Sequence, residues 1–526
     1  MQDAEKIKDY SDIKFFESIK ECGLEETLAL YSKYYAGDFE QSARFFSSLK
    51  LQEKESIDSN VIAIYYPQLS GGGIENVMVK QVGMFRKLGY KPHFILEKAP
   101  EQSLIEAIGI NYSIIPKGSE RDYKERAKEF SNILKKINAC IVIYHAWLNY
   151  LLPWDLLLCK LLNVRFVLHV HGIYTDEMHR LIQKFVSRVC ALRLADAIVS
   201  LNEADAIFWR QVNNRVFVVR NQLGMSCGNI HPAKTINSKT ILWLGRIANM
   251  KRPLDMVKAF KLVHDKCPEA RLLMGGFGNG KLDVQVKEEI KKLGLCEAVE
   301  TVEWKDDVSD LYNQARVFCL TSHSMEGFSL VLLESLAYGL PCVCYDLSYL
   351  TLVSEGNGIL TAPIGNIEKL ANELLFVLND DEFCLKLSNE ARQAAENNEK
   401  YDASNTWSEI LRQSKEDFSP KKDKIDSSAQ VFIEAYIDAV NCLKSSRKLL
   451  AESDKKVEIL NDRVKKQSKQ IKDLRNKQKK SAEENKKLRK KFEKIKNSRS
   501  YKFGRIITCV PRKIVNISKR TGWHKR

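Results

Sequence analysis

Residues 315–346 read ARVFCLTSHSMEGFSLVLLESLAYGLPCVCYD, and they contain the pattern that decides the fold. Short apolar runs at each end, ARVFCLT and PCVCYD, are typical of strands buried on both faces of a parallel sheet. Between them a helical pattern begins at about Ser329. A strand, a helix and a second strand in this order predict one unit of a doubly wound α/β domain.

The same alternation extends in both directions from this unit. Upstream, the strand-like runs TILWLG, ARLLMGG and AVETVEW are separated by helical stretches that begin at Pro253 and Lys281. A second series opens with VIAIYY at residues 61–66 and continues through PHFILE, ACIVIYH, RFVLHVH, ADAIVSL and RVFVVRN. We therefore expect two Rossmann-like domains that face each other across a cleft, because such sheets bind ligands at the carboxyl ends of their strands.

Changes in composition divide the chain into seven segments. The predicted segments are a helical amino-terminal extension (1–55), a first Rossmann-like domain (56–225), a polar linker (226–239), a second Rossmann-like domain (240–395), a helical region (396–420), a basic coiled coil (427–497) and a basic amphipathic tail (498–526).

The net charge of +16 belongs to the end of the chain. Residues 451–526 hold 27 Lys and Arg but only 8 Asp and Glu, so the body is close to neutral and does not have the charge of a nucleic-acid-binding surface. No apolar run approaches the length of a membrane span, and the amino terminus lacks an apolar signal region. We expect a cytoplasmic protein whose scattered cysteines are reduced.

A heptad pattern runs through the basic segment. Leu443, Leu450, Val457, Val464 and Ile471 fall at one core position, and Leu460, Leu474, Leu488 and Ile495 fall at the other. The pattern predicts a coiled coil and a parallel homodimer; a single solvated helix is the alternative. In the tail, aromatic and aliphatic residues are mixed with basic ones, and this pattern favours binding to an anionic membrane surface, the inner face of the cell membrane. A solubilising tail and an RNA-binding tail are the other interpretations.

The polar residues of the opening stretch suggest a ligand site. Glu326 lies in a loop with Gly327 and Phe328, before a helix whose first turn has free backbone N–H groups. A carboxylate in that loop can accept hydrogen bonds from sugar hydroxyls. Glu334 lies two turns along the helix, where it can hold the two hydroxyls of a ribose. By spacing alone, two ordinary solvated glutamates explain the pattern as well.

Cations and glycines follow other strands. Arg246 and Lys251 come after the strand TILWL, where two long cations can grip a diphosphate. Gly72 and Gly73 follow the first strand and open a helix, which lets backbone N–H groups approach a phosphate. A tight strand–helix turn explains those glycines equally well.

His169 and His171 lie at the end of the strand RFVLHV, and strand alternation puts them on one face. A metal pair would need further Asp or His ligands, and the sequence offers none that we can assign. We therefore expect no metal site and no cofactor.

Together these segments resemble glycosyltransferase family 4, of the GT-B fold, from about residue 60 to 410. The resemblance is carried by SGGGIENV, HVHG, ILWLGRIANMKRPLDMVKAF, LLMGGFGNG and, most specifically, EGFSLVLLESLAYGLPCVCYD. It implies a retaining transferase that moves a sugar from a UDP- or GDP-sugar to a hydroxyl of a glycan, a lipid-linked sugar or a wall polymer, without a divalent metal.

The resemblance also implies roles for single residues. Arg246 and Lys251 would bind the donor diphosphate, and Gly72 and Gly73 would approach it from the other domain. The ribose would bind Glu334, the donor sugar would bind Glu326 and the backbone of Gly327 and Phe328, and His171 would stand at the transferring centre.

One segment departs from the family pattern. Where relatives have a Pro-Asn-Gly turn after the last amino-domain strand, this chain has Arg220-Asn221-Gln222.

The carboxy-terminal NSRSYKFGRIITCVPRKI resembles tails of bacterial enzymes of cell-surface polysaccharide assembly. A catalytically inactive scaffold that acts through its coiled coil is the alternative function, and a GT-B phosphorylase is disfavoured because no pyridoxal lysine is evident.

Overall fold

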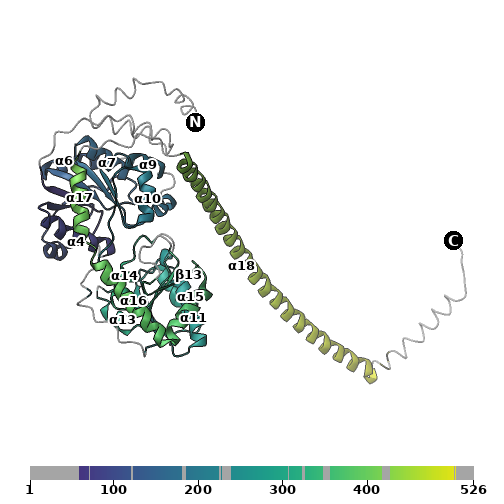
Figure 1. The fold of residues 1–526 in the computed structure, drawn as a ribbon. Coiled ribbons are helices and arrows are strands. Elements are labelled where there is room, and N and C mark those ends of the chain that lie inside the picture. Colours follow the sequence, from purple (N-terminus) through teal and green to yellow (C-terminus); the bar gives the residue numbers. More distant parts are fainter. Residues whose placement is uncertain are drawn as a thin grey trace, which may run out of the picture. The chain divides into compact units, whose positions relative to one another are not determined.

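The computed structural model describes residues 59–69, 72–119, 123–180, 185–223, 227, 238–305, 307–322, 326–347, 356–416, 427–500, 502 and 504. The predicted helical extension (1–55), most of the linker and nearly all of the tail lie outside these residues. The chain divides into two compact units, residues 1–437 and 438–526. The first unit contains two α/β domains (Figure 1).

The amino-terminal domain is a parallel sheet of seven strands in the order β3-β2-β1-β4-β5-β6-β7. Its elements, in chain order, are β1 (Val61–Tyr65), α4 (Gly73–Lys87), β2 (Lys91–Leu96), α5 (Gln102–Ile108), β3 (Asn111–Ile114), α6 (Lys124–Lys136), β4 (Ala139–Tyr144), α7 (Leu152–Leu161), β5 (Arg165–His169), α8 (Tyr174–Arg180), α9 (Phe185–Leu192), β6 (Ala197–Ser200), α10 (Glu203–Val212) and β7 (Val216–Val218).

The carboxy-terminal domain is a parallel sheet of six strands in the order β10-β9-β8-β11-β12-β13. Its elements are β8 (Thr240–Leu244), the 3-10 helix η3 (Asn249–Lys251), α11 (Pro253–Lys266), β9 (Arg271–Phe277), α12 (Lys281–Lys292), β10 (Val299–Glu303), α13 (Ser309–Gln314), β11 (Val317–Leu320), α14 (Leu330–Ala337), β12 (Cys342–Tyr345), β13 (Ile359–Ala362), α15 (Ile367–Asn379) and α16 (Asp381–Glu399).

Central strands were predictable because both of their faces are buried. β4 and β12 are buried at every position, as continuous apolar runs require. The sequence analysis missed β3 and β13, which are four-residue edge strands with polar or exposed positions. In both sheets the strand order reverses beside the first strand, between β1 and β4 and between β8 and β11, which is where doubly wound folds bind ligands.

The chain returns to the first domain after α16. Helix α17 (Ala403–Lys415), green in Figure 1, lies among the purple and teal elements of the amino-terminal domain. Its fully buried Trp407 packs edge-on against Phe85 of α4 and against His169 of β5. The helical region predicted for 396–420 is thus divided, because α16 continues to Glu399 and α17 completes the core of the other domain.

Helix α18 (Ser427–Asn497) forms over the residues predicted as the coiled coil. Its heptad side chains Val457, Leu460, Val464, Ile471 and Leu474 are all more than half exposed. No helix within the described residues carries an apolar stretch long enough to cross a membrane.

Candidate functional site

Two of the predicted residues, 75 positions apart, form an ion pair. Lys251 ends η3 after β8, and its Nζ atom lies 2.6 Å from Oε2 of Glu326 in the loop between β11 and α14. The two side chains are only 14% and 11% exposed. Thr321 donates a hydrogen bond to the carbonyl of Lys251 (2.7 Å) and accepts one from the indole of Trp243 (2.9 Å). These bonds fix the backbone of Lys251.

Glu334 lies on α14, half buried, and points toward groups of both domains. The hydroxyl of Tyr312 donates to its Oε2 atom at 2.8 Å. Burial raises the pKa of Glu334, while the hydrogen bond from Tyr312 and the charge of Lys80 lower it. Because Lys80 belongs to α4 of the amino-terminal domain, the carboxylate faces that domain.

Arg246 follows β8 in an exposed position. Its neighbour Gly245 passes close to β9, where a Cβ atom on Gly276 (φ +104°) would collide with the carbonyl of Gly245. The guanidinium is close enough to Tyr66 to act on its titration: burial and then Glu75 raise the pKa of Tyr66 to about 12, and Arg246 opposes them. Arg246 therefore lies within electrostatic range of Tyr66 in the amino-terminal domain.

The glycines of the first strand–helix turn meet the other domain. Gly72 is the extended N-cap of α4, and Gly73 is the first residue of that helix. A Cβ atom placed on Gly73 would lie 3.3 Å from Cδ1 of Leu330, the first residue of α14. The amino termini of α4 and α14 are thus adjacent, and both leave backbone N–H groups without helical partners.

His171 and Glu326 lie on two loops that touch. A Cβ atom on Gly327 would stand 2.7 Å from the carbonyl oxygen of Gly172, so only a glycine fits this approach without a shift of backbone. Asn202 donates to the carbonyl of Gly327 at 3.1 Å and fixes the contact. The side chain of Phe328 is buried in the core, so the backbone is the part of this residue that can border the site.

The sequence reasoning missed His145, which directly follows β4. Its Nδ1 atom lies 2.8 Å from Nε2 of His171, and one nitrogen each of His145, His169 and His171 lies within 4.8 Å of the others. We call these three residues the histidine cluster. The expectation of no metal site depended on finding no further histidine beside His169 and His171, and the structure places His145 there. The sequence signal that could have identified His145 is its position directly after a buried strand, β4, which pairs with β5.

Lys80 was also missed. Its Nζ atom donates to the carbonyl of Gln222 at 2.7 Å, and Gln222 in turn donates to the carbonyl of Tyr401 at 2.8 Å. The turn that departs from the family pattern is thus held by α4 on one side and by the segment before α17 on the other. Burial lowers the pKa of Lys80, while Glu334 raises it.

A cavity of about 570 Å³ opens at the carboxyl ends of the amino-terminal strands. Tyr66, Trp147 and Tyr150 supply aromatic walls, and Lys98 and Lys117 supply cations. Aromatic faces with a few polar groups are typical of sugar-sized ligand sites.

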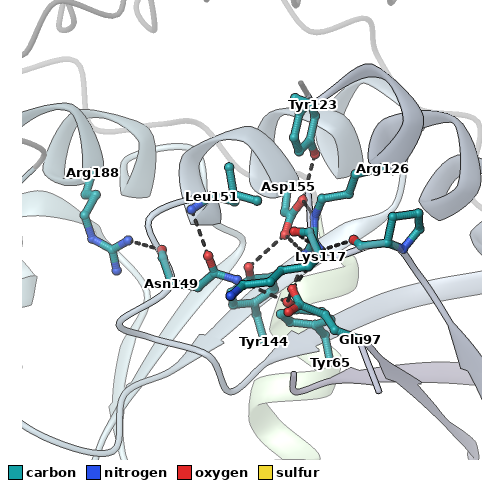
Figure 2. A network of polar contacts seen from close by, with 11 residues as sticks. Tyr65, Glu97, Lys117, Tyr123, Arg126, Tyr144, Asn149, Leu151, Asp155 and Arg188 are labelled. Atoms are coloured by element: carbon teal, nitrogen blue, oxygen red, sulfur yellow. Dashed lines mark hydrogen bonds and ion pairs between the residues drawn. The ribbon is translucent and has the colours of Figure 1, made fainter. Parts of the chain in front are cut away.

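A buried polar network supports this cavity (Figure 2). Arg126 is fully buried and donates to both carboxylate oxygens of Asp155 (3.0 and 2.7 Å) and to Glu97 (2.8 Å). Tyr123 and Tyr144 also donate to Asp155, each at 2.7 Å. Because the charges are paired and hydrogen-bonded, the network is fixed. Arg126 also donates to the hydroxyl of Tyr65 (2.9 Å), which accepts from Asn149 (3.1 Å), so the network holds the loop that bears Asn149.

Comparisons with known proteins agree with this arrangement. The sequence model of the glycosyltransferase family 4 domain matches residues 71–221, and that of glycosyl transferases group 1 matches residues 229–394. An uncharacterized glycosyltransferase of Haemophilus influenzae is 26% identical over 337 residues, which are 62% of this chain and 92% of that protein. A poly(glycerol-phosphate) alpha-glucosyltransferase of Bacillus subtilis is 32% identical over 201 residues, 37% of this chain but 29% of that enzyme.

The fold has a solved counterpart. Anabaena HepE, crystallised in complex with UDP, superposes with a TM-score of 0.57 at 16% identity, over 67% of this chain and 99% of that one. The two matched family models together span more than half of the residues. The chain belongs to the group 1 glycosyltransferases, with a family 4 amino-terminal domain and the GT-B fold.

Proposed function

We propose that the enzyme moves a sugar, with retention of anomeric configuration, from a nucleotide-diphosphate sugar to a hydroxyl of a glycan, lipid-linked or wall-polymer acceptor. The single observation that carries this proposal is the Lys251–Glu326 ion pair, next to the contact between Gly327 and the loop of His171. A cation for the phosphate, a carboxylate for the sugar and the histidine of the other domain thus come from three segments that meet.

The diphosphate would lie between the two domains. Lys251 and Arg246 offset the charge that develops on the leaving phosphate, and the adjacent amino termini of α4, at Gly72 and Gly73, and of α14, at Leu330, add backbone donors. Glu334, already oriented by Tyr312, receives the ribose hydroxyls. HepE was crystallised with UDP and with UDP-glucose, which supports a uridine nucleotide over a guanosine one.

The donor sugar would lie over Glu326 and the backbone of Gly327 and Phe328. In the proposed step the bond between the anomeric carbon and the phosphate oxygen breaks, and the acceptor oxygen bonds to that carbon on the same face. The acceptor proton passes to the leaving phosphate. Glu326 then acts as an orienting carboxylate, since Lys251 already engages it, and the step needs no metal ion.

The acceptor would enter the cavity of the amino-terminal domain, which is lined by Lys98, Lys117 and His145. His145 lies beside His171. Lysines beside aromatic walls suit an acceptor that carries both sugar and phosphate. The Bacillus relative acts on poly(glycerol-phosphate), which supports a phosphate-containing polymer.

A thermal-shift screen against nucleotide sugars, followed by transfer assays on phosphate-containing acceptors, tests the proposal. Lys251→Ala and Glu326→Ala should each abolish transfer while the fold persists. Lys261→Ala is a matched control, because this lysine forms an exposed ion pair with Asp265 on α11. Near-normal turnover in either site variant contradicts the mechanism, and a scaffold without activity would show no transfer with any donor.

The exposed apolar stripe of α18 supports a parallel homodimer. Light scattering should give twice the chain mass, and Leu460→Lys should shift it toward the monomer, because it puts a charge in the seam. Lys469→Ala, on the outer face of the predicted heptad, is the control. A monomeric wild type at micromolar concentration would contradict the dimer.

The tail of residues 498–526 would hold the enzyme at an anionic membrane surface. Full-length protein should float with vesicles that contain an anionic phospholipid, and not with neutral ones, and added salt should weaken the binding. Equal flotation with both kinds of vesicle would contradict an electrostatic anchor.

A further inference from the structure

The histidine cluster has the arrangement of a metal-ligand set. His145 follows β4, His169 ends β5 and His171 lies two residues further on. Because β4 and β5 are paired in parallel, their carboxyl ends lie at the same edge of the sheet. The ring centroids are separated by 4.3 to 5.1 Å, and one nitrogen of each ring lies within 4.8 Å of the others, so the three imidazoles form one compact group.

The cluster also leaves polar atoms unsatisfied. His145 and His169 are buried, and within the described residues the Nε2 atom of each has no hydrogen-bond partner. A buried polar group without a hydrogen-bond partner destabilises the folded protein. Two such atoms within one cluster are available to a further ligand.

Gln81 of α4 supplies an outer contact. Its amide lies 3.1 Å from Nδ1 of His169, and its Oε1 atom is a further buried atom without a partner among the described residues. A half-turn of the amide lets Oε1 accept the proton of Nδ1. His169 then presents the lone pair of Nε2, as metal-binding histidines do when a second group holds their other nitrogen.

The cluster adjoins the cavity of the amino-terminal domain. His145, although fully buried, is one of the residues that line this cavity of about 570 Å³. Ligand atoms around one tetrahedral Zn²⁺ lie about 3.4 Å apart for bonds of about 2.0–2.1 Å, so nitrogens that lie within 4.8 Å of one another need to approach by at most about 1.4 Å.

We propose that His145, His169 and His171 bind one Zn²⁺ ion, with a fourth position open to the cavity. Imidazole ligands favour zinc, copper, iron and nickel over magnesium or calcium. The proposed function places His171 at the transferring centre, and on that assumption the bound metal inhibits transfer by holding the ring of His171.

Metal binding is measured directly, without reference to activity. The full-length protein, stripped of metal and kept with a phosphine reductant, is dialysed against Zn²⁺ and analysed for metal. We expect one high-affinity ion per chain. Co²⁺ in its place should give the visible bands of a nitrogen-ligated site without a thiolate charge-transfer band, which separates the cluster from the cysteines.

Variants locate the ion. His145→Asn and His169→Asn should each weaken Zn²⁺ binding at least tenfold, and Gln81→Leu, which retains all three ligands, should weaken it about 10- to 100-fold. His93→Asn is the control, because this histidine is on β2 and contacts Ser113. No Zn²⁺ bound by the wild type, or unchanged affinity in the cluster variants, overturns the site.

Inhibition is tested separately. Zn²⁺ should suppress transfer by the wild type at concentrations that match its binding, and Gln81→Leu should need 10- to 100-fold more. Full activity of the zinc-loaded enzyme overturns the inhibitory role and leaves the site standing. Absence of transfer even in metal-free protein counts against the proposed function, while the dialysis result still decides the metal site.

Discussion

Replacing Lys251 by methionine should reduce both stability and transfer, for reasons that a second substitution can separate. The change removes the cation 2.6 Å from Glu326 and leaves that carboxylate about one-tenth exposed without its partner. Breaking a buried pair costs about 3–5 kcal/mol, and breaking an exposed one about 0–1 kcal/mol. The exposures of 14% and 11% place this pair near the buried limit, so we expect a loss of about 3 kcal/mol.

Thermal unfolding of the carboxy-terminal domain measures that loss. For a domain of this size, 1 kcal/mol shifts Tm by about 2–4 °C, so Lys251→Met should lower the transition by about 6–12 °C. The double variant Lys251→Met with Glu326→Gln has no unpaired charge, and its Tm should return to within about 4 °C of the wild type.

Transfer should not return with stability. Loss of one electrostatic contact to a developing charge costs about 10²–10³ in kcat, and the double variant should be at least as impaired as Lys251→Met. Recovery of transfer together with stability would refute the reasoning, because the pair would then support the fold and take no part in chemistry.

Three further predictions concern the amino-terminal domain and its contact with the other one. Gly327→Ala should reduce kcat at least tenfold, since the added Cβ would stand 2.7 Å from a backbone carbonyl, whereas Gly83→Ala, with nothing within 4 Å, should not; equal activities would contradict the close loop contact. Arg126→Met should destabilise the domain by about 3–5 kcal/mol in urea unfolding, because Asp155 and Glu97 lose their buried partner, and a loss below 1 kcal/mol would show that water replaces the guanidinium. Burial lowers the pKa of His171 to about 3, and the pKa values of the other two cluster histidines also lie well below their usual value. Below about pH 6.5 the unfolded chain therefore binds more protons than the folded chain, and the protein becomes less stable as the pH decreases. Between pH 7.5 and 5.5 the wild type should lose about 1.4 kcal/mol more stability than His145→Phe. An equal loss in both proteins would mean that the ring of His145 titrates normally when folded.

The alternation of strands and helices could be predicted because it depends on local patterns. A run such as VIAIYY is apolar at every position only when both faces of its strand are covered, so the sequence itself indicates a parallel sheet. The ends of helices and edge strands depend on neighbours, and for that reason β3 and β13 were missed.

The candidate site was predictable as a set of segments and not as a geometry. The motifs around Lys251 and Glu326 are local, and each could be identified from its own residues. Their contact depends on η3 and the β11–α14 loop lying at the same edge of one sheet, and no local pattern contains that information.

The sequence by itself therefore determined that two α/β domains are followed by a long basic helix, since hydrophobic period and composition encode both, and the resemblance of its motifs to a family of glycosyltransferases supplied the candidate site residues. Only the tertiary structure decided that α17 returns to the first domain, that Gly172 and Gly327 touch, and that His145 joins His169 and His171. These contacts join residues far apart in the chain, and they exist only once parallel strands bring their carboxyl ends to a common edge.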